Sequence, residues 1–111
     1  MNRIKILSEK ISVKNCLSYN KFVNYTNQLS EHAKQQPGFI SSKTYYKEPL
    51  EMQKLPINVI TISEWKNMES WENWYNSDIR NEIYNDFKDT IKKEEYNLIF
   101  KKNNINDIFL L

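Results

Sequence analysis

Residues 57–83 read INVITISEWKNMESWENWYNSDIRNEI, and this stretch carries the strongest fold signals in the chain. Four of the first nine residues are β-branched aliphatics, which predicts a strand over residues 57–65. Asn67 is the expected N-cap of a short helix that ends near Asn76, and Ser77 is the expected N-cap of a second helix. The aromatic stripe of the first helix is Trp71, Trp74 and Tyr75.

The segment from Ser18 to Gln36 has the period of an amphipathic helix. Ser18 is its expected N-cap. Pro37 and Gly38 end it, because Pro disfavours the helical conformation at the residue before it and Gly allows a positive φ. The apolar stripe of this helix is Tyr19, Phe22, Val23, Thr26, Leu29 and Ala33.

Three more strands are predicted, over residues 4–13, 39–47 and 96–102. In residues 4–13 the apolar side chains change parity after Ile6, which indicates a bulge or a twist. The helix that follows Ser77 has a stripe with a step of four residues: Ile79, Ile83, Phe87 and Ile91. The order β-α-β-β-α(α)-β predicts an α+β, ferredoxin-like split βαβ fold with a four-stranded antiparallel sheet and helices on one face.

Composition excludes several kinds of site. The 111 residues include one Gly, one Cys and one His, which excludes an intrachain disulfide framework, a multi-His metal site and a Gly-rich phosphate loop. The 16 basic and 14 acidic residues give a net charge of +2, which is too balanced for a nucleic-acid-binding protein. No apolar run approaches the roughly 18–20 residues of a membrane span, and the N-terminus does not resemble a signal peptide. We therefore expect a cytoplasmic protein with no metal, nucleic-acid or membrane partner.

Three stretches together resemble a known family. They are QPGFISSKTYY at 36–46, VITISEWKNMESWENWYNSDIRNEI at 59–83, and the preceding helix with Phe22 and Leu29. This arrangement, over residues 4–102, resembles the antibiotic biosynthesis monooxygenase (ABM) domain, whose fold is a dimeric α+β barrel. The positions that match the family pattern are Pro37, Gly38, Phe39, Trp65, Asn67, Glu69, Trp71, Trp74 and Ser77.

The resemblance implies a ligand pocket between the sheet and its covering helices. Several family members oxidise phenols or quinols with O2 and without metal or flavin, so it implies a cofactor-independent monooxygenase for an aromatic or quinol-type small molecule. Such a pocket needs aromatic walls, a few polar groups near the phenol and exclusion of water. Trp74 and Tyr84 are the best catalytic candidates, and the expected substrate-binding residues are Phe22, Trp71, Trp74, Tyr84 and Phe87.

Heme binding or heme degradation is a second hypothesis, because another branch of the family degrades heme. That branch has a ligating His ten residues after the Trp that corresponds to Trp74, and at this position the chain has Tyr84. A tyrosine can bind ferric heme as phenolate. The branch also has an Asn on the first strand. Residues 4–13 contain no Asn, and only Ser8, Glu9 and Lys10 could lie near that place.

A third hypothesis is a non-catalytic small-molecule-binding protein or a structural dimer. No residue is an obvious strong catalytic base, since His32 lies in a polar setting near the end of the first helix, where a surface or capping role is expected. A cavity smaller than about 300 Å³ would favour this hypothesis. An aromatic-lined cavity to which Trp74 and Tyr84 are both exposed would favour the oxygenase.

We expect one ABM-like domain over residues 1–102, followed by a C-terminal tail over residues 103–111. The tail ends in the apolar residues 108–111, so we expect it to dock on the protein, with the partner copy as one such place. Apolar residues remain for both faces of the sheet. The sequence therefore predicts a homodimer in which two sheets pack face to face and bury well over ~1,200 Å².

Overall fold

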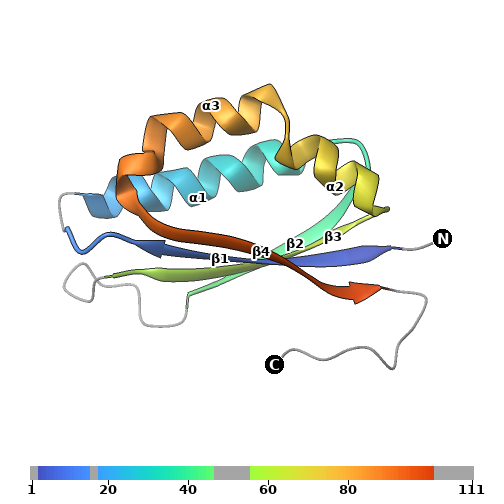
Figure 1. Cartoon of the computed structure of the whole chain (residues 1–111), viewed down its shortest axis with the longest axis horizontal. Helices are drawn as coiled ribbons and strands as arrows, with labels where there is room; N and C mark the ends of the chain where they lie inside the picture. The colour runs from blue at the N-terminus through green and yellow to red at the C-terminus, as the bar shows by residue number, and fades with distance from the viewer. Residues whose placement is uncertain (1–2, 16–17, 47–55, 102–111) are drawn as a thin grey trace.

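The computed structural model describes residues 3–15, 18–46 and 56–101, and the side chains up to residue 99. Its four strands form one antiparallel sheet in the order β2-β3-β1-β4, and all the helices cover one face of that sheet (Figure 1). This is the predicted ferredoxin-like arrangement. The elements are β1 (Ile4–Ser12), α1 (Tyr19–Ala33), β2 (Phe39–Tyr46), β3 (Asn58–Trp65), α2 (Met68–Tyr75), α3 (Asp78–Phe87), η2 (Lys88–Thr90) and β4 (Ile91–Lys101).

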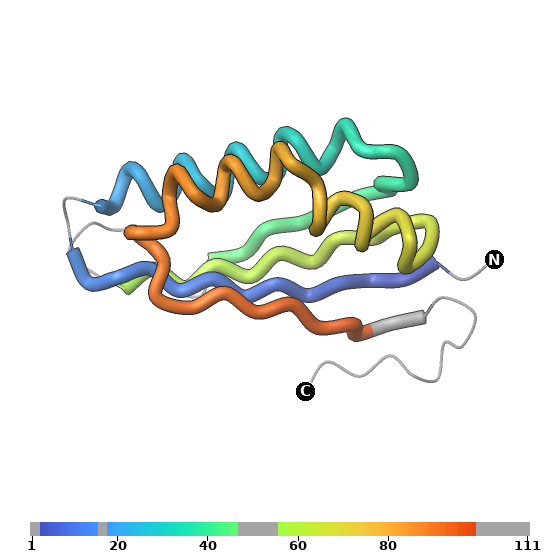
Figure 2. Tube along the Cα trace, turned by 45° about the horizontal axis from the view of Figure 1, so that its top comes forward, coloured from blue at the N-terminus to red at the C-terminus, as the bar shows by residue number. Residues whose placement is uncertain are grey.

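The core lies between the sheet and the two long helices. Helices α1 and α3 lie side by side above the strands, and α2 leads from β3 into α3 (Figure 2). Tyr25 of α1 and Trp65 of β3 are among the most deeply buried side chains. The other members of the main cluster are Ile4, Ile6, Leu29, Trp74, Ile83 and Phe87. No helix among the described residues is both long and apolar enough to cross a membrane.

Local signals in the sequence set most of the helix boundaries. Gly38 has φ +87° and lies in the turn that leads into β2, where the backbone N–H of Phe39 donates to the Gln36 carbonyl. Helix α1 itself ends at Ala33, three residues before the predicted end at Gln36. The Asn67 side chain accepts a hydrogen bond of 2.8 Å from the backbone N–H of Ser70, which confirms the N-cap of α2. Ser77 caps α3 in the same way. Ser18 is the N-cap residue of α1 as predicted, but its side chain makes no capping hydrogen bond to the helix.

The end of the chain differs from the prediction. Helix α3 ends at Phe87 and the turn η2 follows, so Ile91 opens β4 instead of continuing the helical stripe. Strand β4 therefore begins five residues before the predicted start at residue 96. Residues 92–95 read KKEE, and a run in which every residue is charged lacks the alternation of apolar and polar residues by which a strand is recognised in a sequence. The predicted tail at 103–111 lies outside the described residues.

Strand β1 does not change parity. Its buried side chains alternate without interruption from Ile4 to Ser12, although the inward row changes from apolar to polar at Ser8. The irregularities that do occur are register shifts against β4, between Lys5 and Ile6 and near the end of β1. The apparent parity change is therefore a change in the chemistry of one face.

The middle of the sheet is polar where it faces the helices. Thr61 and Ser63 of β3 point toward α1, together with Ser8 of β1, which is paired with Thr61. Ile60 and Ile62 occupy the alternate positions of β3, so they lie on the opposite face. The helix-facing side of the sheet is therefore apolar in the core and polar at its middle, next to α1. The outer face has Ile60 and Ile62 next to charged residues, with Glu9 opposite Ile60.

Candidate functional site

A cavity of about 50 Å³ lies between α1 and the polar middle of the sheet. We call it the α1 cavity. Four hydroxyl-bearing side chains from three neighbouring strands form its floor: Ser8, Ser42, Thr61 and Ser63. Helix α1 forms its roof with Thr26, Leu29, Ser30 and Ala33. A site lined in this way can bind a polar ligand by hydrogen bonds to several hydroxyl groups.

Aromatic side chains close the α1 cavity at the end nearest α2. They are Phe39, Trp65, Trp71, Trp74 and Tyr96. The indole N–H of Trp65 donates to Ser63 Oγ at 2.9 Å, and Phe39 packs edge-on against the Trp65 ring. Aromatic walls of this kind pack against flat rings, while the hydroxyl floor can bind polar substituents.

Lys10 brings a buried amine to this cavity. The side chain points inward from β1 and is 5% exposed. Its Nζ donates to Ser8 Oγ at 3.1 Å and lies 5.2 Å from the centre of the Tyr96 ring. Within the described part of the chain, Lys10 forms no ion pair. Burial lowers the pKa of Lys10 to about 8, with Glu94 acting in the opposite direction and Arg80 in the same one.

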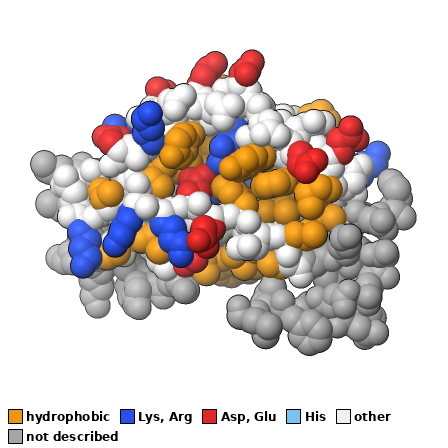
Figure 3. Space-filling view, in the orientation of Figure 1, with side chains coloured by type: hydrophobic (Ala, Val, Ile, Leu, Met, Phe, Trp, Pro, Cys, Tyr) orange, Lys and Arg blue, Asp and Glu red, His pale blue; other side chains and the backbone are white. Residues whose placement is uncertain are grey.

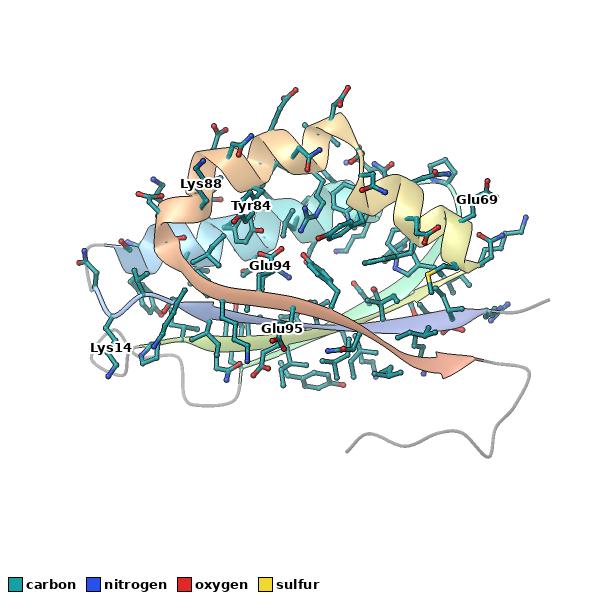
Figure 4. The ribbon with its side chains drawn as sticks, viewed as in Figure 1. Lys14, Glu69, Tyr84, Lys88, Glu94 and Glu95 are labelled. Carbon is teal, nitrogen blue, oxygen red and sulfur yellow. The ribbon has the colours of Figure 1, made fainter. Side chains whose placement is uncertain are left out.

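A hydrogen-bonded cluster of four residues lies beside Lys10, between α1, α3 and β4. We call it the Arg80 cluster: Tyr25, Arg80, Glu94 and Tyr96. Arg80 Nη2 donates to Glu94 Oε2 at 2.6 Å and to Tyr96 Oη at 2.8 Å. The hydroxyl of Tyr25 donates to Glu94 Oε1 at 2.6 Å, and that of Tyr96 donates to Glu94 Oε2. Figure 4 shows Glu94 pointing from β4 toward the helices and Glu95 pointing to the other face.

Tyr25, Arg80 and Tyr96 of the Arg80 cluster all have raised pKa values, so they stay protonated. Burial and the neighbouring Glu94 raise the pKa of both Tyr25 and Tyr96. Burial opposes the charge of Arg80, but Tyr96 and Glu94 outweigh that effect, so the pKa of Arg80 is raised. The carboxylate of Glu94 therefore accepts three hydrogen bonds from within the cluster. Its charge partly opposes the lowering of the Lys10 pKa by burial, although no hydrogen bond or ion pair joins the two side chains in the described part of the chain.

A second hollow lies on the outside of the cluster, between α3 and β4. It has a volume of about 330 Å³ and opens to solvent. Figure 3 shows it as a recess between apolar side chains, with acidic and basic side chains inside. We call it the α3–β4 groove, and its lining residues are Tyr75, Arg80, Asn81, Tyr84, Glu94 and Tyr96. Tyr96 borders both the groove and the α1 cavity, so this side chain separates them.

The structure does not bring the five sequence-predicted site residues together. Trp71 and Trp74 line the α1 cavity, whereas Tyr84 lines the α3–β4 groove. Phe22 is fully buried in a small cluster with Ile57 and Val59, and Phe87 belongs to the main core. Tyr84 follows Ile83, which points into the core, and one step along a helix turns the side chain toward the β4 edge.

The site residues that the sequence patterns do not reveal are polar and lie on strands or at helix edges. They are Lys10, Tyr25, Arg80, Glu94 and Tyr96. A signal for the hydroxyl floor is present, because Ser42 and Thr44 alternate in one strand and Thr61 and Ser63 in the next. Lys10 has no periodic signal, since an inward lysine on a strand has the same sequence pattern as an outward one. The family resemblance alone places it, with Ser8 and Glu9, near a functional position of the first strand, and of these Ser8 and Lys10 line the α1 cavity. Among the described residues, no cluster of three or more His, Cys, Asp or Glu is found that could hold a metal ion.

Comparison with known proteins relates this geometry to solved structures. No family model matches the sequence, and no curated protein matches it. The fold is similar to SnoaB, a cofactor-independent oxygenase from Streptomyces nogalater, with a TM-score of 0.69 at 9% identity over 90% of this chain and 93% of that one. It is also similar to an antibiotic biosynthesis monooxygenase, with a TM-score of 0.69 at 9% identity over 87% and 96% of the two chains.

The chain has the fold of the antibiotic biosynthesis monooxygenases. A conserved protein from Methanosarcina mazei has a similar fold, with a TM-score of 0.64 at 22% identity over 86% of this chain and 90% of that one. The resemblance read from the PGF turn and the tryptophan pattern is therefore confirmed for the fold. The ABM fold hosts more than one activity, so function rests on the site itself.

Proposed function

We propose that this protein is a cofactor-independent monooxygenase that uses O2 to oxidise a small hydroxylated aromatic molecule in the α1 cavity. The observation that carries the proposal is the α1 cavity itself, where a hydroxyl-lined floor and the amine of Lys10 meet a wall of three tryptophans. An inert core would not place a lysine there without an acidic partner, because burying an uncompensated charge is unfavourable. The similarity to the SnoaB fold supports the reaction class.

The proposed reaction needs little covalent chemistry from the protein. A deprotonated phenol is electron-rich enough to react with O2, and the net change converts one ring C–H and the phenol O–H into a quinone, with one oxygen atom in the product and the other in water. The protein must hold the phenolate, orient the ring and exclude bulk water. Trp71 and Trp74 would hold the ring, and the hydroxyl floor would bind its polar substituents.

The volume of the α1 cavity limits how the substrate can lie. About 50 Å³ holds a hydroxyl group and a few water molecules, but it is far below the ~300 Å³ of an ordinary ligand site. The α3–β4 groove is larger and is separated from the cavity by Tyr96. We propose that a change in the Tyr96 rotamer joins the two spaces, so that the ring lies at the boundary and its hydroxyl group enters the cavity.

Oxygen consumption tests the proposed function. Wild-type protein should consume O2 with at least one member of a panel of monocyclic and polycyclic phenols and quinols. Trp74→Phe should reduce kcat/KM, because the wall against the ring becomes smaller. Tyr45→Phe on the outer face is the matched control and should leave the rate unchanged. Absence of O2 uptake with every member of the panel would refute the proposal.

A non-catalytic binding protein is the second candidate, and the small volume of the α1 cavity favours it. The same panel separates the two candidates, because a binding protein would show ligand binding without O2 uptake. The heme hypothesis needs Trp74 and Tyr84 on one ligand, and they line different hollows. A hemin titration of wild type and Tyr84→Phe tests it, since a Tyr84-ligated heme would change its Soret band in the variant.

We further propose that the protein is a homodimer whose outer sheet faces pack together. Ile60 and Ile62 lie on the outer face of the central strand β3, and Leu7 is paired with Ile62 from β1. Tyr45 is opposite Ile60 on β2 and is 50% exposed. These apolar side chains form a patch over three neighbouring strands, with Lys43 opposite Ile62 and Glu9 opposite Ile60 at its sides. A patch of this kind on the outer face favours a sheet with both faces covered.

A further inference from the structure

Lys10 is a buried amine, and the acid nearest to it, Glu94, is hydrogen-bonded to Arg80 instead. It is opposite Glu94 in the register of β1 and β4. Glu94, however, accepts hydrogen bonds from Arg80, Tyr25 and Tyr96, which occupy both of its oxygens. The one side-chain bond of Lys10 among the described residues is to Ser8 Oγ. Among the described residues that line the α1 cavity there is no carboxylate, so the Lys10 ammonium has unused hydrogen-bond donors there and Glu94 acts on it only from outside the cavity.

We infer that Lys10 accepts the proton of the substrate hydroxyl group and then holds the substrate as a phenolate, paired with the Lys10 ammonium inside the α1 cavity. The inference rests on the proposed function for the presence of an aromatic substrate. It names the ligand class more narrowly, as a hydroxyarene that binds by its ionisable O–H. It also supplies the general base that the sequence patterns do not reveal.

The proton transfer balances without any other reactant. The neutral amine of Lys10 attacks the phenol proton, the O–H bond breaks, and both of its electrons stay on the phenolate oxygen. A new N–H bond makes Lys10 an ammonium, and the resulting pair has no net charge. The missing counter-ion of Lys10 is thus supplied by the ligand, which makes the bound pair less costly to bury than either ion alone.

The groups around Lys10 are suited to this role. Glu94 and Tyr96 of β4 and Arg80 of α3 are its titratable or charged neighbours, and Tyr25 of α1 belongs to the same cluster. Its partner on β3, Val59, has no titratable group. Burial lowers the pKa of Lys10 to about 8, so a substantial fraction is neutral in mildly alkaline solution. The raised pKa values of Tyr25 and Tyr96 keep both phenols protonated over the same range. A base with a pKa near the working pH is the most effective proton acceptor.

Two phenols of different acidity give a sharp test, measured as binding under anaerobic conditions so that no turnover occurs. The complex contains one proton shared between amine and phenol, so affinity is highest between the pKa of Lys10 and that of the phenol. 4-Methylphenol is as weakly acidic as a tyrosine, with a pKa of about 10. Its affinity should fall about tenfold per pH unit below pH 8. 4-Nitrophenol is more acidic than Lys10, so its affinity should instead fall above pH 8.

Three variants complete the experiment. Lys10→Met should abolish the 4-methylphenol limb below pH 8. In this variant 4-nitrophenol should bind best as the neutral phenol, so its affinity should be highest at low pH, whereas in the wild type it falls again below the pKa of the phenol. Lys10→Arg keeps a permanent cation, so 4-nitrophenol affinity should no longer fall above pH 8. Lys43→Met, at an exposed lysine of β2, should behave as wild type.

The outcomes separate the inference from the proposed function. A 4-methylphenol limb below pH 8 and a 4-nitrophenol affinity that falls on both sides of an optimum in the wild type, both lost in Lys10→Met, support the inference even if no O2 is consumed. Identical pH profiles for wild type and Lys10→Met would overturn it, even if O2 consumption establishes the oxygenase. If a variant fails to fold, the wild-type profiles alone decide the question, because a 4-nitrophenol affinity that stays constant above pH 8 also contradicts the inference.

Discussion

Lys10 and Glu94 face each other across β1 and β4, yet Glu94 pairs with Arg80 and Lys10 bonds to Ser8. One buried carboxylate thus lies between two buried basic side chains. Arg80 and Glu94 form a buried ion pair in which both side chains are 8% exposed. Lys10 is left as an excess positive charge beside a cavity, and this excess is what makes the α1 cavity complementary to an anion.

The first prediction concerns the stability cost of Lys10. Its pKa is about 8 in the folded protein, against about 10.4 for an unfolded lysine. Below pH 8 the folded protein must therefore hold a disfavoured ammonium, and we expect Lys10→Met to raise the free energy of unfolding at pH 7 by about 1–3 kcal/mol. Urea denaturation of both proteins measures this difference.

The lowered pKa of Lys10 also predicts how the free energy of unfolding changes with pH. Between pH 8 and 10 the unfolded chain keeps the Lys10 proton that the folded chain has released, so wild-type stability should rise with pH. Lys10→Met should lack this rise, and the two stability curves should approach each other toward pH 10. Parallel curves across this range would show that Lys10 is not buried as an unpaired cation.

The second prediction concerns the Arg80 cluster. Glu94→Gln removes the only carboxylate of the cluster and leaves Arg80 buried without a counter-ion, which should lower the free energy of unfolding by about 3–5 kcal/mol. Asp89→Asn is the matched control at an ion pair with Lys21. That pair is 3.0 Å long but exposed, so solvent screens it and the substitution should change stability far less than Glu94→Gln does. Equal effects at the two sites would contradict a structural role for the cluster.

The third prediction concerns the turn between α1 and β2. Gly38 has φ +87°, and a Cβ placed there would lie 2.1 Å from Ser70 Oγ. Gly38→Ala should therefore lower the free energy of unfolding by about 2 kcal/mol or more, from backbone strain together with this clash. Adding Ser70→Gly should relieve only the clash, so the double variant should remain less stable than Ser70→Gly alone. Full recovery would mean that the positive φ carries no strain.

The fourth prediction concerns the outer face. Ile62→Asp introduces a charge into the proposed sheet-to-sheet interface, so it should shift sedimentation from dimer toward monomer at micromolar concentration. Asn27→Asp, on the exposed surface of α1, should leave the sedimentation profile unchanged. A wild-type protein that sediments as a monomer would contradict the proposed homodimer without any variant.

Local chemistry made much of the fold predictable from the sequence. Asn67 and Ser77 each act within a few residues of themselves, so a pattern of neighbours is enough to predict where α2 and α3 begin. Gly38 marks the turn before β2, whereas α1 ends earlier, at Ala33. The tryptophan spacing around Trp74 added the family resemblance, and the fold confirms it. Ser18 occupies the predicted N-cap position of α1, but its hydroxyl does not bond to the first turn.

The site was harder to predict because it depends on long-range pairing. Lys10 has meaning only because β1 sits in the middle of the sheet and its even-numbered residues face α1. Glu94 lies in a charged run that looks solvated until β4 is placed beside β1. Arg80 reaches it from fourteen residues away on α3. The periodicity of a single element does not show that β1, β4 and α3 meet at one place. The sequence therefore predicts the aromatic wall of the cavity but not the charged cluster beside it.

The most direct test of Lys10 as the phenolate's partner is a crystal structure of wild-type protein soaked with 4-nitrophenol at pH 7.5. We predict the phenolate oxygen within hydrogen-bond distance of Lys10 Nζ, the ring against Trp74, and Tyr96 moved from the position that separates the cavity from the groove. A ring bound in the α3–β4 groove against Tyr84, with Lys10 still bonded to Ser8, would contradict this role.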